Sequence, residues 1–66
     1  MTDVSVRNEG SIFLLTPLSP EARAWFGEHL PDDALTFGPA TVVEHRYVAD
    51  ILGGMAQDGL ALGAAS

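Results

Sequence analysis

Four prolines set the limits of what this chain can form, because proline fixes its own backbone and lacks an amide hydrogen. Pro17 ends an apolar strand, since it cannot donate to a β-ladder. Pro20 fits the first position of a helix, and Pro31 pushes the residue before it out of helical geometry. Pro39 belongs to a glycine-proline pair that indicates a turn between two short strands, with one bent strand as the alternative. The prolines therefore predict a strand, then a helix, then two short strands around a turn.

The first strand is predicted from the alternating "VSV" at 4–6 and the apolar run "SIFLL" at 11–15. Asn8, Glu9 and Gly10 lie between these two parts and have the character of a turn or a bulge. We interpret the whole segment as one strand.

Two segments have the apolar spacing of helices. In the first, Ser19 is a good N-cap and Glu21 suits the positive end of the helix dipole. The second is "HRYVADILGGMAQDGL", where Gly59 fits the left-handed position after a helix. In the first helix, the side chains predicted to face inward are Ala22, Phe26 and Leu30, with Trp25 and His29 beside them. In the second helix, they are Tyr47, Ile51 and Met55, with Val48, Leu52 and Ala56 beside them.

The predicted order is strand, helix, strand, strand, helix, strand. This is the α+β, ferredoxin-like βαββαβ pattern, with an antiparallel sheet and both helices on one face. A βαββα fold without the last strand is the alternative. The 66 residues form a single domain, 1–66, in which 1–3 and 63–66 are expected to be frayed.

Composition restricts the function. The chain has no cysteine, which excludes disulfides and thiolate metal sites. Neither a secretory signal nor an apolar run of about 20 residues is present, so we expect a protein of the cytoplasm with no membrane partner. Nine acidic residues face three arginines and no lysine, giving a net charge of -6. This charge argues against direct binding to nucleic acid and favours a partner protein with a basic surface.

The stretch "GEHLPDD" at 27–33 is the densest group of ionisable side chains. His29, Asp32 and Asp33 are possible metal ligands, but Pro31 breaks the helix between them. No nucleophile or phosphate-loop motif is present, and so small a fold has little room for a pocket. We therefore expect no metal, no cofactor and no enzymatic activity.

The carboxylates are better explained as a charged surface. Glu21 and Glu28 are seven residues apart, so they share a helix face about 10 Å apart along the axis. Regularly spaced negative charge resembles a phosphate backbone. The opposing interpretation is a solvated face that only keeps the protein soluble. The candidate partner-binding residues are Glu21, Glu28, Asp32, Asp33, Asp50 and Asp58.

The face of the sheet that the helices leave open is a second candidate surface. Along "SIFLL", Ile12 and Leu14 face one way while Phe13 and Leu15 face the other. An open face with apolar side chains suits a dimer or a partner interface. A small dimeric regulatory or antitoxin-like module is therefore the alternative function, although we expect a monomer rather than a homodimer.

Two segments, "NEGSIFLLTPLSPEARAWF" and "VVEHRYVADILGGMAQDGL", resemble small acidic proteins of phages and mobile elements. Among these, the chain is similar to anti-CRISPR inhibitors of type I-C Cascade in Pseudomonas, with "SIFLL", "VVEHRY" and "DGL" as the recognisable parts. The resemblance implies a non-catalytic protein that binds a Cas protein of the effector complex in the host bacterial cytoplasm. Blocking of target-DNA binding by an acidic, DNA-mimicking surface would suit the effector's positively charged DNA path.

Overall fold

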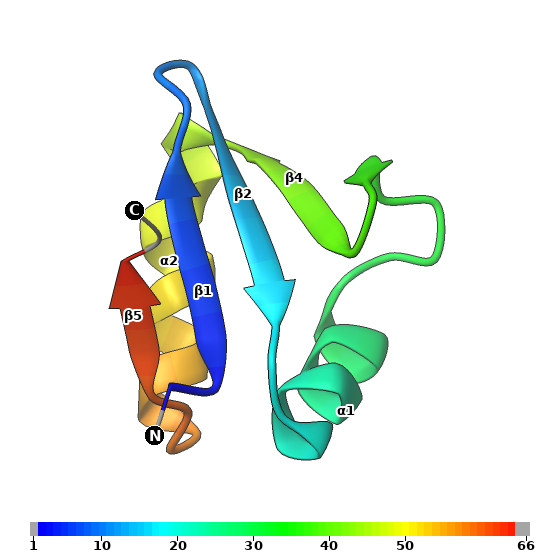
Figure 1. Cartoon of the computed structure of the whole chain (residues 1–66), viewed down its shortest axis with the longest axis vertical. Helices are drawn as coiled ribbons and strands as arrows, with labels where there is room; N and C mark the ends of the chain where they lie inside the picture. The colour runs from blue at the N-terminus through cyan, green and yellow to red at the C-terminus, as the bar shows by residue number, and fades with distance from the viewer. Residues whose placement is uncertain (1, 65–66) are drawn as a thin grey trace.

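The computed structural model describes residues 2–64, which form a five-stranded sheet and two helices (Figure 1). A small α+β protein is therefore confirmed. Along the chain, the elements are β1 Val4–Asn8, β2 Ile12–Pro17, α1 Pro20–His29, β3 Thr36–Phe37, β4 Ala40–Glu44, α2 His45–Gln57 and β5 Leu62–Ala64.

The strands lie in the order β3-β4-β2-β1-β5, which is not the ferredoxin-like order that the sequence predicted. The prediction of a purely antiparallel sheet is also wrong. β1 pairs with β2, β2 with β4 and β3 with β4 in antiparallel fashion, but β1 pairs with β5 in parallel. The sheet is mixed because α2 connects β4 to a strand at the far edge, beyond β2 and β1.

The difference in topology begins at the first turn. Gly10 has a positive φ of 91°, and its amide donates to Oδ1 of Asn8 over 2.8 Å. The amide of Glu9 donates to the carbonyl of Ile12 over 2.9 Å. These bonds close a hairpin, so the segment that we interpreted as one strand is two. Of the turn and the bulge that the sequence left open at Asn8-Glu9-Gly10, the structure has the turn.

The helix boundaries follow the sequence closely. Oγ of Ser19 accepts a hydrogen bond from the amide of Ala22 over 3.1 Å, which confirms the predicted N-cap of α1. At the end of α2, Gly59 has a φ of 90°, and the amide of Leu60 donates to the carbonyl of Met55. This is a Schellman ending, with glycine in the left-handed position as predicted.

The last strand forms, so the alternative without it is excluded. We expected Gly63 and Ala64 to be frayed, but both belong to β5. They are ordered because Gly63 pairs with Ser5, and Ala64 with Val6, in the parallel ladder. Asp3 is also held, since its amide donates to the carbonyl of Ala61 over 2.8 Å. The expectation for residues 1, 65 and 66 falls outside the described residues.

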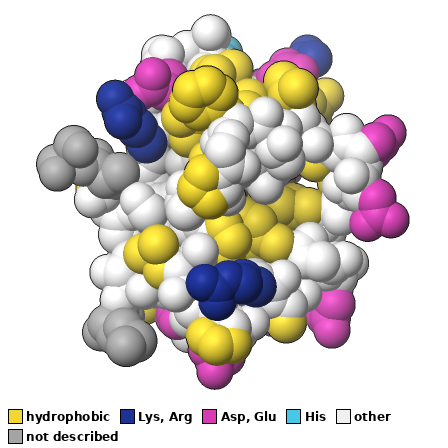
Figure 2. All heavy atoms as spheres, turned by 45° about the vertical axis from the view of Figure 1, so that its right-hand side comes forward, with side chains coloured by type: hydrophobic (Ala, Val, Ile, Leu, Met, Phe, Trp, Pro, Cys, Tyr) yellow, Lys and Arg dark blue, Asp and Glu magenta, His cyan; other side chains and the backbone are white. Residues whose placement is uncertain are grey.

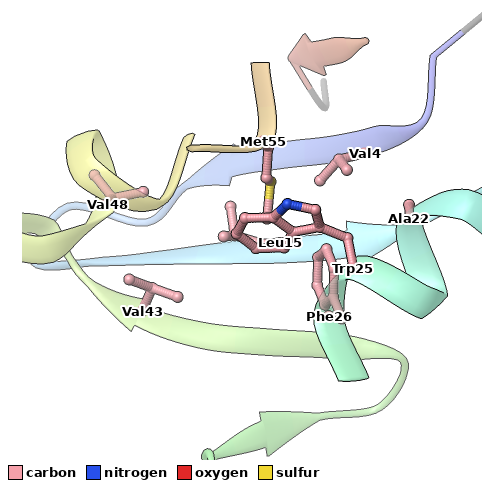
Figure 3. Packing of buried hydrophobic residues seen from close by; sticks show 8 residues of the cluster. All are labelled: Val4, Leu15, Ala22, Trp25, Phe26, Val43, Val48 and Met55. Atoms are coloured by element: carbon pink, nitrogen blue, oxygen red, sulfur yellow. The ribbon is translucent and has the colours of Figure 1, made fainter. Parts of the chain in front are cut away.

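One hydrophobic core lies between the sheet and both helices. Trp25 and Phe26 of α1 and Met55 of α2 gather over Leu15 of β2 (Figure 3). Since both helices contribute to this cluster, both cover the same face of the sheet. Leu15, Met55 and Val4 are fully buried, and each contributes about 1.5–3 kcal/mol of hydrophobic stabilisation. Tyr47, which the sequence placed on the inward stripe, is 51% exposed because it lies in the first turn of α2, at the margin of the core.

Candidate functional site

The face of the sheet opposite the helices has an apolar centre. Leu14 lies between Arg7 of β1 and Val42 of β4, and Ile12 lies opposite Glu44. These residues alternate with the buried residues of the core, so their side chains point away from it. The prediction that Ile12 and Leu14 face away from Leu15 is confirmed.

A hollow of about 240 Å³ lies on this open face. Leu35 and Phe37, which precede and form β3, stand beside it and are 70% and 71% exposed. The hollow is lined by Glu9, Ile12, Leu14, Leu35, Phe37 and Val42. Exposed apolar side chains next to one another are typical of protein interfaces. Sequence reasoning found the open face but not the exposure of these two side chains.

The charged residues near the open face form ion pairs. Nε of Arg7 lies 2.6 Å from Oε2 of Glu9, and Nε of Arg46 lies 3.0 Å from Oε2 of Glu44. Each pair is electrically neutral. Seven carboxylates and Arg23 remain elsewhere in the chain, and together they account for the whole net charge of -6.

The six candidate carboxylates are all exposed, and three of them lie on the helices. Glu21 and Glu28 lie on α1, and Asp32 and Asp33 follow in the connection to β3. Asp50 lies on α2 and stands apart, about 12 Å along the axis from Asp58. Figure 2 shows acidic side chains projecting from the right-hand and lower margins of one face, around hydrophobic side chains at its centre.

Asp58 differs from the other five because it has side-chain partners on α1. Its Oδ2 accepts a hydrogen bond from Nε1 of Trp25 over 2.7 Å and lies 3.9 Å from Nε2 of His29. The His29 ring stacks on the Trp25 ring, with centroids 4.1 Å apart. This contact brings Asp58 to the end of α1 that also holds Glu28. No local sequence pattern predicts this contact, since 33 positions separate Trp25 from Asp58.

Asp3 is a carboxylate with a structural role. Its Oδ2 accepts a hydrogen bond from the amide of Ala61 over 2.8 Å. This bond, with a second from the Ser19 side chain, holds the pKa of the Asp3 carboxyl below its usual value. Asp3 therefore ties the start of β1 to the segment before β5.

A second hollow, of about 280 Å³, lies between α2, β4 and the connection that follows α1. Leu30, Pro31, Ala34 and Leu35 line one side of it, and Asp32 and Asp33 belong to the same connection. Acidic and apolar groups are therefore adjacent at this edge of the molecule.

No group of three or more histidine, aspartate or glutamate side chains within residues 2–64 is arranged to hold a metal ion. His29 stacks on the Trp25 ring and its Nδ1 lies 3.1 Å from the Trp25 carbonyl oxygen. Asp32 and Asp33 do not form a metal-binding group with it. No helix in the described part of the chain has both the length and the apolar character that crossing a membrane requires.

Comparison with protein-family models, with curated proteins and with solved structures gave no match for this chain.

Proposed function

We propose that this chain is a non-catalytic anti-CRISPR protein that binds a type I-C Cascade effector in the host bacterial cytoplasm. It blocks target-DNA binding by occupying a basic surface with its carboxylates. The observation that carries the proposal is the distribution of charge: the two ion pairs neutralise Glu9 and Glu44, and the remaining carboxylates have only Arg23 to balance them.

The C-terminal end of α1 is the best candidate for the contact. Glu28, Asp32 and Asp33 fall within six positions there, and all three are exposed. A DNA strand has one phosphate about every 3.4 Å, so a basic channel built for DNA attracts closely spaced negative charge. Asp58 keeps its charge, but the Trp25 hydrogen bond fixes the position of its carboxylate.

The test is binding of the purified protein to a type I-C Cascade, with labelled double-stranded target DNA as competitor, at two salt concentrations. We expect the protein and the DNA to exclude each other, and salt to weaken binding, because exposed charges are screened beyond about 8–10 Å. Tight binding without competition would keep the inhibitor but remove the DNA mimicry. No binding at either salt concentration would contradict the proposal.

A matched pair of variants locates the contact. Asp32→Lys with Asp33→Lys should slow association with Cascade, since electrostatic steering acts mainly on the association rate. Glu9→Lys with Glu44→Lys makes the same change in net charge at the ion pairs of the open sheet face. If both double variants lower the association rate constant by the same factor, the effect comes from net charge alone. The end of α1 would then not be the contact.

A further inference from the structure

The hollow between α2, β4 and the α1–β3 connection combines apolar walls with unbalanced negative charge on both sides. Leu30 and Leu35 line it on the side of the connection, and Tyr47 and Ile51 line it on the side of α2. We propose that this hollow receives a basic amphipathic helix of the partner protein, which inserts apolar side chains between the walls and directs Lys or Arg toward the carboxylates. The inference rests on the proposed function in taking the end of α1 as the contact.

The connection holds two carboxylates beside the hollow. The amide of Ala34 donates to the carbonyl of Pro31 over 3.0 Å, which closes a turn. Asp32 and Asp33 occupy the two central positions of this turn and are exposed. Because Pro31 and Ala34 themselves line the hollow, the two aspartates stand next to its apolar wall.

The opposite side of the hollow also has a carboxylate. Asp50 is exposed and follows Tyr47 by three positions, so the two residues are neighbours on the surface of α2. Arg46 does not offset this charge, because its Nε lies 3.0 Å from Oε2 of Glu44. The Arg46 guanidinium also lies over the Tyr47 ring, 5.0 Å from its centroid. Negative charge therefore borders the apolar walls from both α2 and the connection.

This arrangement selects a basic amphipathic helix as the occupant. Such a helix has an apolar stripe with cations on either side, and helices of this kind bind in apolar grooves. Strand addition does not fit, because the edge strand β3 offers only two residues to a partner's backbone. A second copy of the chain does not fit either, since it would bring a net charge of -6 to a site that is already negative. The volume of about 280 Å³ lies below the roughly 300–1,000 Å³ of small-molecule pockets, so it suits anchoring side chains.

The experiment is a nuclear magnetic resonance titration of the whole, isotope-labelled chain with a synthetic peptide of leucine and lysine, in which the leucines have helical spacing. We expect saturable shifts of the amide signals of Ala34, Tyr47 and Ile51, with a dissociation constant below about 1 mM. A lysine and serine peptide of equal length and charge should bind at least about tenfold more weakly, because it lacks the apolar anchors. Absence of binding by the first peptide, or equal binding by the second, would overturn the inference.

A matched pair of aromatic substitutions locates the apolar contact. Tyr47 is 51% exposed and lines this hollow, whereas Phe37 is 71% exposed and lines the hollow of the open sheet face instead. Tyr47→Ser should raise the dissociation constant of the leucine and lysine peptide at least about fivefold, and Phe37→Ser less than about twofold. Circular dichroism verifies that each variant folds. If Phe37→Ser weakens binding as much as Tyr47→Ser, this hollow is not the docking site.

A matched pair of charge substitutions tests the carboxylates. Asp32→Asn with Asp33→Asn should raise the dissociation constant of the same peptide about fivefold. Glu9→Gln with Glu21→Gln is the control, since it also removes two negative charges and changes the net charge from -6 to -4. Equal losses for the two double variants would show that net charge alone attracts the peptide, which would overturn the inference.

Binding to Cascade separates this inference from the proposed function. Tyr47→Ser should raise the dissociation rate of the complex with Cascade at least about fivefold, because loss of an apolar anchor acts mainly on dissociation. Cascade binding that Tyr47→Ser leaves unchanged would retain the proposed function and overturn the inference. Peptide binding in the hollow without any Cascade binding would support the inference and contradict the proposed function.

Discussion

Asp58 has a structural role in addition to its charge. It accepts the hydrogen bond of Trp25 Nε1, which joins α1 to the end of α2. Hydrogen bonds to charged groups contribute about 1.5–3 kcal/mol when buried, and this carboxylate is half exposed. We therefore expect Asp58→Ala to lower the free energy of unfolding by about 1–2 kcal/mol, measured by urea denaturation.

Asp33→Ala is the control for this prediction. It removes an equal charge from an exposed side chain for which the structure shows no hydrogen bond among residues 2–64. Its effect should stay within about 0.5 kcal/mol. Equal losses for Asp58→Ala and Asp33→Ala would mean that the Trp25 contact adds nothing to stability.

Asp3 makes stability depend on pH. Hydrogen bonds from the Ala61 amide and the Ser19 side chain lower the pKa of its carboxyl in the folded state. Stability from such a group is present above the unfolded pKa, about 4 for aspartate, and is lost as the pH falls through the folded pKa. We expect Asp3→Asn to be less stable than the parent at pH 7, and the difference to shrink toward pH 3. A difference that is constant across this range would contradict the assignment.

At the scale of elements, the sequence predicts what local chemistry determines. Ser19 and Pro31 bound α1, and Gly59 ends α2, because caps and breakers act within a few residues. The β1–β2 hairpin was missed because Asn8-Glu9-Gly10 is compatible with a turn and with a bulge. Whether the segment forms a turn or a bulge depends on the pairing of Leu14 with Arg7. That pairing is a contact between two strands, which the local sequence does not determine.

The two adjacent glycines of α2 differ in their surroundings. A Cβ at Gly53 would meet no atom within 4 Å, whereas one at Gly54 would lie 3.4 Å from Cζ2 of Trp25. Gly53→Ala should therefore stabilise the protein by about 0.5–1 kcal/mol through helix propensity alone. Gly54→Ala should gain less, since the Trp25 ring must shift slightly. Thermal unfolding of both variants measures this order, and a destabilised Gly53→Ala would show that this side of α2 is not free.

At the scale of the whole molecule, the ion pairs determine where the net charge lies. The sequence supplies the total charge, but only the fold shows that Arg7 and Arg46 neutralise Glu9 and Glu44. The unbalanced carboxylates Asp32 and Asp33 adjoin the exposed Leu35 in the connection between α1 and β3. Salt should therefore weaken contact between these carboxylates and a basic partner.

The same imbalance should affect folding. Like charges repel in the folded state, and salt screens this repulsion, so the melting temperature should rise as salt is added at neutral pH. Asp32→Lys with Asp33→Lys adds four charge units and changes the net charge from -6 to -2. Both residues are exposed in the α1–β3 connection, so the fold should persist while the response to salt becomes smaller. Differential scanning calorimetry at several salt concentrations measures the two slopes. Equal slopes would show that charge repulsion does not limit stability, whereas a smaller slope in a folded variant also validates its use in the Cascade binding test.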